Sequence, residues 1–148
     1  MTLFRRSKAA HIRLGMAGER AAARALERLG CRIVARNART PFGELDIVAF
    51  DGAALLFVEV KTLREKPNFA PAGNLSRAQC VRNRRAAEYY LTLLRPGKVP
   101  VYRFDLVEVV FRNRRVTELR RTPDYLEPSG AEVVAEALAR KSFWGYII

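Results

Sequence analysis

Apolar residues follow a helical period in two segments of the chain and an extended period in several others. Between Gly18 and Leu29 they recur three and four positions apart, and Gly30 is a typical residue after a helix end. A second helix is predicted over Ser76–Leu94, before Pro96-Gly97. Strands are predicted over residues 31–37, 43–50, 54–61, 99–111 and 115–119, and a short helix over 132–141. This order predicts an α/β fold, in which a mixed central sheet has helices on both faces.

The strands on either side of Asp51-Gly52 form the clearest predicted hairpin. With Asp51-Gly52 as a two-residue turn, Glu44 lies directly opposite Glu59, and Asp46 lies diagonal to Glu59. Because side chains alternate along a strand, one face of the hairpin then carries Glu44, Asp46, Glu59 and Lys61. The opposite face is expected to be wholly apolar, with Leu45, Ile47, Ala49, Leu56, Val58 and Val60.

Three carboxylates and a lysine at the end of an otherwise apolar hairpin are costly without compensation, because like charges raise one another's pKa. A divalent cation would remove the conflict, and carboxylate oxygens with few other protein ligands suit Mg²⁺ or Mn²⁺. The alternative is a solvated hairpin end with ordinary Glu–Lys pairs. The apolar neighbours on both faces make the charges exceptional, and both interpretations stay open at this point.

The chain of 148 residues has 27 Lys and Arg residues against 15 Asp and Glu residues, a net charge of +12. So large a charge favours a polyanionic partner, nucleic acid first and an acidic membrane surface second. No aromatic RNA-recognition sheet motif is present, which disfavours an RNA-recognition domain. A run of charges is commonly only a solvated face, but phosphate contacts are predicted for Arg36, Arg39, Arg77, Arg82, Arg84 and Arg85.

Composition also excludes several classes of protein. His11 is the single histidine, so Ser-His-Asp triads, HExxH metalloproteases and histidine–metal nucleases are excluded. The chain has no GxxxxGK[ST] loop, and its longest apolar run, Ala53–Val58, is too short for a membrane span. Two cysteines and the lack of a secretion signal favour a reduced cytoplasmic protein.

The length of the chain predicts one main domain, over residues 15–121, between two terminal segments. Residues 1–14 contain five basic or histidine side chains and no acid, and are expected to form a solvated basic arm. Residues 122–148 are expected to add a C-terminal helix and the aromatic segment Phe143–Ile148. We expect this aromatic segment to pack or self-associate, as in a homodimer, rather than to anchor in lipid.

Five short motifs occur in order along the chain. They are Gly18-Glu19-Arg20, Arg36-Asn37-Ala38-Arg39, Gly43-Glu44-Leu45-Asp46, Phe57-Val58-Glu59-Val60-Lys61-Thr62 and Arg103-Phe104-Asp105. This set resembles the restriction-endonuclease-like, or PD-(D/E)xK, nucleases. It is most similar to the bacterial YraN family, which in turn is similar to archaeal Holliday-junction resolvases. The resemblance implies a restriction-endonuclease-like core of a helix, three strands, a helix and a strand, the order predicted above.

The resemblance also implies roles for the clustered residues. Asp46 and Glu59 would be metal ligands, and Lys61 would orient or activate the attacking water. Glu44 and Glu19 are further candidate ligands of the metal. For Glu19, which follows the apolar stripe of the first helix, the alternative is a first-turn glutamate stabilised by the helix dipole.

The chain departs from the family pattern at Gln79 and Cys80, where the family usually has a lysine followed by a glutamine. The resemblance and the charge together predict a metal-dependent nuclease that hydrolyses DNA, with branched or distorted DNA as candidate substrates. The departure favours an alternative, a nucleic-acid-binding module that keeps the nuclease fold without efficient turnover. A third interpretation is a basic scaffold that docks to a membrane or to the ribosome.

Overall fold

The computed structural model describes residues 2–65, 75–94 and 99–126 of the chain. The predicted C-terminal helix over 132–141, the aromatic segment Phe143–Ile148 and Pro96-Gly97 lie outside the described residues. In chain order, the elements are α1 (Thr2–Arg28), β1 (Arg32–Thr40), β2 (Gly43–Asp51), β3 (Ala54–Arg64), α2 (Arg77–Thr92), β4 (Tyr102–Arg112) and β5 (Arg115–Leu126).

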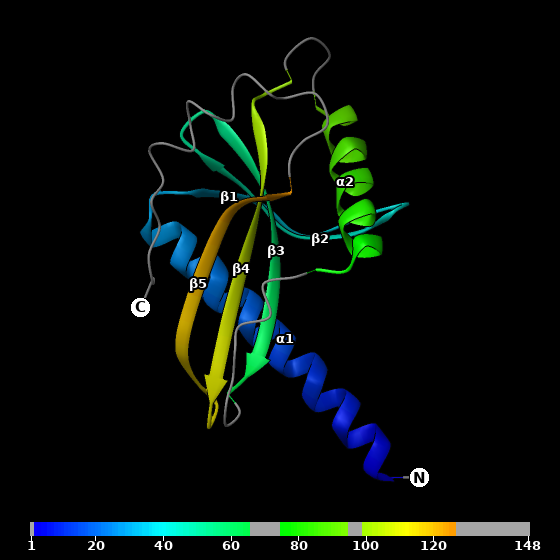
Figure 1. The fold of residues 1–148 in the computed structure, drawn as a ribbon, viewed down its shortest axis with the longest axis vertical. Helices are drawn as coiled ribbons and strands as arrows, with labels where there is room; N and C mark the ends of the chain where they lie inside the picture. Colours follow the sequence, from blue (N-terminus) through cyan, green and yellow to red (C-terminus); the bar gives the residue numbers. More distant parts are fainter. Residues whose placement is uncertain (1, 66–74, 95–98, 127–148) are drawn as a thin grey trace.

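The five strands form one mixed sheet in the order β1-β2-β3-β4-β5. Neighbouring strands are antiparallel except β3 and β4, which run parallel and are connected through α2. Figure 1 shows α1 crossing the sheet diagonally and α2 standing beside a different part of it. The predicted α/β class, with a mixed sheet and helices on both faces, is confirmed. The last strand is longer than predicted, because it continues past Leu119 to Leu126.

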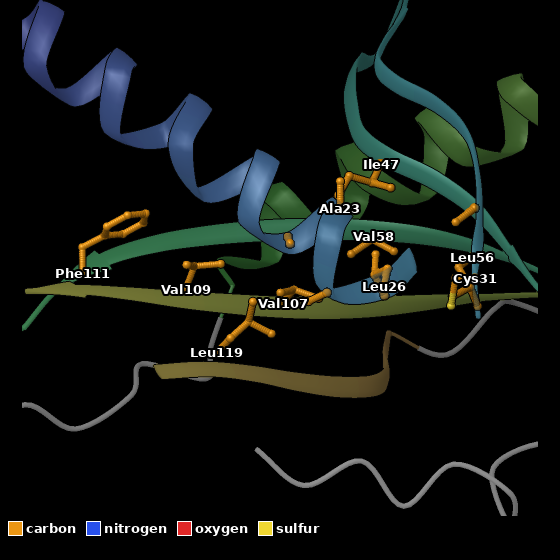
Figure 2. Close-up of a cluster of buried hydrophobic side chains, with 13 residues drawn as sticks. Ala23, Leu26, Cys31, Ile47, Leu56, Val58, Val107, Val109, Phe111 and Leu119 are labelled. Atoms are coloured by element: carbon orange, nitrogen blue, oxygen red, sulfur yellow. The ribbon is translucent and has the colours of Figure 1, made fainter. Parts of the chain in front are cut away.

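Each helix covers its own buried cluster on the sheet. On the α1 side, Leu26 is 1% exposed and lies among side chains of the central strands, including Val58 and Val107 (Figure 2). Because β2 and β3 contribute to both clusters, their sequences are apolar on both faces over most of their length. The cluster on the α2 side contains Val48, Phe57, Ala86, Ala87 and Phe104.

The first helix is longer than the apolar pattern predicts. α1 begins at Thr2 rather than at Gly18, so the residues of the predicted basic arm form the first half of a single helix. Side chains between Ser7 and Arg13 are mostly exposed and need no apolar stripe, while their Arg, Lys and Ala residues have high helix propensity. Among the described residues, neither helix combines the length and the apolar character that crossing a membrane requires.

The hairpin of β2 and β3 has a register different from the predicted one. Asp51 pairs with Ala54, and the turn between them begins at Gly52, which has a φ of +59°. The prediction that Glu44 lies directly opposite Glu59 is therefore wrong. Asp51 stays in the strand because its carboxylate binds two arginines, one from β4 and one from β5. The register differs by an even number of positions, so side chains near the turn keep their predicted faces.

The predicted alternation of faces fails at the other end of β2. Ile47 packs in the α1-side cluster as predicted, but Leu45 packs with Val48 in the α2-side cluster. The reversal falls on Asp46, which lies between the two cluster members. On the neighbouring strand β1, Asn37 lies between the partners of Leu45 and Ile47. Asn37 has a φ of +50°, a left-handed conformation that disturbs regular pairing.

Gly18 marks a close approach between α1 and β3. A Cβ atom at this position would overlap Oγ1 of Thr62 and would lie 3.0 Å from the Cβ atom of that threonine. We expect Gly18→Ala to lower the free energy of unfolding by about 1–3 kcal/mol, because the helix or the strand must move. Urea unfolding measures the loss, and displacement of the neighbouring Glu19 should accompany it.

Gly15 provides a matched control in the same helix. A Cβ atom at Gly15 would meet no atom within 4 Å. Gly15→Ala should therefore stabilise the protein by about 0.5–1 kcal/mol, because alanine loses less backbone entropy than glycine in a helix. Equal stability of the Gly18→Ala and Gly15→Ala variants would contradict the close packing of α1 on β3.

Candidate functional site

The candidate acids lie just beyond the last pair formed by β2 and β3, which is Ile47 with Val58. Asp46 precedes this pair on β2, and Glu59 follows it on β3. Oδ2 of Asp46 accepts a hydrogen bond from the backbone N–H of Val60 at 2.8 Å. The carboxylate of Asp46 thus bridges the two strands where their regular pairing stops, and this contact keeps it next to Glu59.

Glu59 is buried, with 9% exposure, and α2 holds both of its carboxylate oxygens. Nε2 of Gln79 donates to Oε1 at 2.5 Å, and Nδ2 of Asn83 donates to Oε2 at 3.2 Å. The two amides are one helical turn apart, so they reach the carboxylate from the same face of α2. A carboxylate has about four lone-pair sites, so further ligands can still bind to Glu59.

Lys61 follows on the same face of β3, and 36% of its side chain is exposed. Its Nζ atom donates to Oε1 of Gln79 at 3.0 Å and lies 3.8 Å from Oε1 of Glu59. Gln79 therefore links the two charged residues, because its amide accepts from the lysine and donates to the glutamate. This link fixes the ammonium group beside the acid, within reach of solvent.

Glu19 approaches the same point from α1. It lies in the interior of that helix, so the alternative interpretation of Glu19 as a first-turn glutamate is wrong. Its carboxylate accepts a hydrogen bond from Asn37, and its charge raises the pKa of both Asp46 and Glu59. Glu44 is exposed on β2, and its charge also raises the pKa of Asp46.

Burial and mutual repulsion make these carboxyl groups weaker acids. Burial first, and then the charge of Glu59, raises the pKa of Asp46 from 3.8 to about 7. Burial also raises the pKa of Glu59, against the opposing effect of Lys61. Burial likewise raises the pKa of Glu19. A positive charge between these groups would favour their ionised forms again.

The arrangement can be compared with the needs of a divalent cation. The described residues contain no group of three Asp, Glu, Cys or His side chains that could hold a metal ion by themselves. Mg²⁺ is commonly held by one or two carboxylates together with water and substrate phosphates, and Asp46 with Glu59 is such a pair. Both residues line a hollow of about 10 Å³, close to the size of one water molecule. The chemistry of this pair therefore suits Mg²⁺ or Mn²⁺, which Asp46 and Glu59 could hold only together with ligands from outside the described residues.

Three residues that support the acids were not among the candidates drawn from the sequence: Gln79, Asn83 and Tyr125. Nδ2 of Asn83 also donates to Oη of Tyr125 at 2.9 Å, and the tyrosine ring packs edge-on against Phe104. The spacing of four residues between the two α2 amides is the sequence signal that could have paired them. No local pattern connects Tyr125, on β5, with α2, since that contact depends on the folded sheet.

The predicted phosphate-binding arginines lie on two elements, β1 and α2. Arg36 of β1 lies near Glu19, and Arg82 of α2 lies near Glu59, so that each lowers the pKa of its acidic neighbour. Arg84 is half-buried, and the other candidates are exposed: Arg39, Arg77 and Arg85.

The chain also matches known proteins over the part that contains this site. Residues 18–109, more than half of the chain, match the model of the family described as "Uncharacterised protein family UPF0102". The chain belongs to the UPF0102 family. UPF0102 is the YraN family, so the membership predicted from the motifs is confirmed.

Several UPF0102 proteins are similar to the chain over much of its length. The one from Symbiobacterium thermophilum is 46% identical over 97 residues, which cover 66% of this chain and 81% of the relative. The one from Chlorobaculum tepidum is 44% identical over 97 residues, 66% of this chain and 74% of the relative. A relative from Mycolicibacterium vanbaalenii is 39% identical over 106 residues, 72% of this chain and 87% of its own length. The UPF0102 match includes the acids, Lys61, Gln79 and Asn83, whereas residues 2–17 of α1 and all of β5 lie outside it.

Proposed function

We propose that this UPF0102 protein is a cytoplasmic, metal-dependent nuclease that hydrolyses phosphodiester bonds in DNA. The observation that carries the proposal is the proximity of Asp46, Glu59 and Lys61 where β2 and β3 stop pairing. Carboxylates with raised pKa values beside a lysine, in a protein with a net charge of +12, suit a divalent cation and a phosphate group. Linear, flapped and branched DNA are the substrates to compare.

The residues of the site would divide the work according to their contacts. Asp46 and Glu59 would hold Mg²⁺ or Mn²⁺, and Glu44 and Glu19 are acids near enough to influence the ion. The amides of α2 keep the carboxylate of Glu59 in place. Lys61 would donate a hydrogen bond to a phosphate oxygen or orient the attacking water, because its ammonium group is held beside Glu59 and is partly exposed.

The metal ion would contribute the activation of water. When bound, it would lower the pKa of a coordinated water and offset the negative charge that develops on the phosphate. The exposed arginines of α2 and β1, such as Arg85 and Arg39, would bind other phosphates of the same DNA. These contacts would be independent of base sequence and sensitive to salt.

One observation favours a second candidate function, a DNA-binding module with little turnover. Gln79 binds both the ammonium group of Lys61 and one oxygen of Glu59, so it would restrain both groups from moving toward a substrate or a metal ion. A protein of this kind would bind DNA with a steep salt dependence that Mg²⁺ does not change.

Incubation with labelled linear, flapped and four-way DNA tests the proposed nuclease. We expect cleavage in Mg²⁺ or Mn²⁺, no cleavage in EDTA, and strong loss of cleavage in Glu59→Gln. Glu88→Gln is the matched control, because Glu88 is an exposed glutamate on α2. Failure to cleave any substrate, or equal cleavage by wild type and Glu59→Gln, would contradict the nuclease and leave the binding module.

A further inference from the structure

The first half of α1 extends past one end of the sheet. Figure 1 shows it projecting where β3 ends and where the turn between β4 and β5 lies. A groove runs along each side of this part of the helix. One groove, of about 690 Å³, lies between α1 residues such as His11 and the end of β3 at Thr62–Arg64.

The second groove concentrates positive charge. It measures about 560 Å³, and its charged lining residues are Arg13 of α1, Arg64 of β3 and Arg114 of the β4–β5 turn. The three arginines have no acidic partner among the described residues. The nearby Glu65 is paired with Arg112. Like charges brought together in this way repel one another unless an anion binds between them.

The backbone conformation of Arg114 is a second observation on this groove. Arg114 has a φ of +65° in the two-residue turn between Arg112 and Arg115. This left-handed conformation costs a non-glycine residue about 1–2 kcal/mol, and glycine or asparagine is the usual choice in such a turn. The turn therefore carries an arginine at a position where its backbone is unfavourable and its side chain lines the groove.

Two of the three groove arginines lie outside the segment that matches the family. Arg13 and Arg114 both lie outside residues 18–109, the segment that matches UPF0102, while Arg64 lies inside it. Sequence from both sides of that segment thus converges on one end of β3. No acid precedes Glu19 in the chain, so the half of α1 that forms the groove has only basic charges.

We infer that this groove binds the phosphate backbone of a DNA arm that continues beyond the candidate cleavage site. The inference rests on the proposed function, which supplies the DNA, and adds a second place at which the protein holds it. Arg64 follows Lys61 by three positions on β3, about 10 Å along the strand at 3.3 Å per residue, and its side chain projects from the α1 face of the sheet, whereas that of Lys61 projects from the α2 face.

Charge and shape favour DNA over an acidic lipid surface as the occupant. The arginines belong to three different elements and line a concave groove, which a projecting phosphate backbone can enter. A lipid surface is flat and would instead favour a continuous apolar stripe on the helix. The helix does expose Ile12 and Met16, so lipid binding is a measurable competing outcome.

DNA binding at several salt concentrations tests the inference. Fluorescence anisotropy with a labelled DNA duplex compares two double variants, both in an Asp46→Asn background that slows cleavage. Arg64→Gln/Arg114→Gln alters the groove, and Arg24→Gln/Arg28→Gln removes the same charge from exposed positions near the other end of α1. We expect the groove variant to bind about tenfold more weakly at 0.1 M salt, with a salt slope smaller by about 1–2. The control should change less than about twofold, and thermal melting should show both variants folded.

The outcomes separate this inference from the proposed nuclease. Equal binding by the groove variant and the control would overturn the groove, even when the wild type cleaves DNA. A selective loss of binding by the groove variant supports the groove even when no cleavage occurs. Absence of DNA binding by the parent protein at low salt would overturn it. The inference would also be overturned if phosphatidylglycerol vesicles bound the parent protein but not the groove variant while both proteins bound DNA equally.

Discussion

Asp46→Asn is expected to reduce metal-dependent DNA cleavage by about 10²–10³-fold, the usual effect of removing one electrostatic contact at a reacting centre. Asparagine keeps the shape of the side chain and an oxygen that can accept the hydrogen bond from Val60. It removes the negative charge that would hold the cation with Glu59. Initial rates of cleavage in Mn²⁺, with Glu88→Gln as the control variant, measure the effect. Cleavage at the wild-type rate would show that Asp46 is not a metal ligand.

The same substitution should not harm the metal-free fold. Because the pKa of Asp46 is raised from 3.8 to about 7, the folded state holds this carboxyl group protonated more strongly than the unfolded state does. Ionisation therefore costs stability progressively as the pH rises from about 4 to about 7. Asn cannot ionise, so Asp46→Asn should match the wild type near pH 4 and exceed it above pH 7.

Melting temperatures between pH 4 and pH 8, with and without Mn²⁺, test this second effect. Wild type should gain stability from Mn²⁺ by mass action, by about 2.7 kcal/mol at a hundredfold excess over Kd. Asp46→Asn should lose most of that gain. Strong destabilisation of the metal-free variant would show that Asp46 makes a structural contact that asparagine cannot replace. Lys61 is not that contact in the structure, since its ammonium group pairs with Glu59 and Gln79.

Local sequence patterns predicted the parts of the site that depend on strand alternation. Glu59 and Lys61 are two positions apart on one strand, so their common face follows from the period of a strand. The prediction for Asp46 was less complete, because the face of β2 reverses between Leu45 and Ile47. That reversal coincides with Asn37 on the neighbouring strand, and a pattern along β2 alone does not contain it.

The rest of the site depends on contacts between residues far apart in the chain. Gln79 departs from the family pattern, which the sequence shows. Its bridge between Glu59 and Lys61 does not follow from the sequence, because it requires α2 to lie over β3. Tyr125 reaches Asn83 only because β5 pairs with β4 as far as Leu126. In the same way, the predicted register of the hairpin was wrong because turn propensity was its only basis. In the structure, Asp51 also forms ion pairs with arginines that are distant in the sequence.

Those ion pairs belong to a buried network that centres on Asp105 of β4, which is fully buried. Its Oδ1 accepts from Nε of Arg103 at 3.0 Å, and its Oδ2 accepts from Nε of Arg121 at 2.8 Å. The backbone N–H of Asp124 also donates to Oδ1, at 3.3 Å. Asp51 adds a second carboxylate, 26% exposed, beside the same two guanidinium groups. The network therefore ties the hairpin turn to β4 and β5.

Asp105→Asn should lower the free energy of unfolding by about 3–5 kcal/mol, the range found when one member of a buried ion pair is removed. The variant leaves two buried guanidinium groups with Asp51 as their remaining carboxylate partner in the network. Urea unfolding measures the loss as a lower midpoint with an unchanged slope. Asp51→Asn is the control, and it should cost less because Asp51 is partly solvated.

A double substitution separates lost charge balance from lost shape. Arg121→Met added to Asp105→Asn leaves one guanidinium group for the one carboxylate of Asp51, so the double variant should be more stable than Asp105→Asn alone. Because Asp105 also holds the backbone of Asp124, next to Tyr125, its loss should loosen the contact between Tyr125 and Asn83. Asp105→Asn should then cleave DNA more slowly even where it is still folded. An Asp105→Asn variant as stable as wild type would mean that Asp51 alone can balance both arginines.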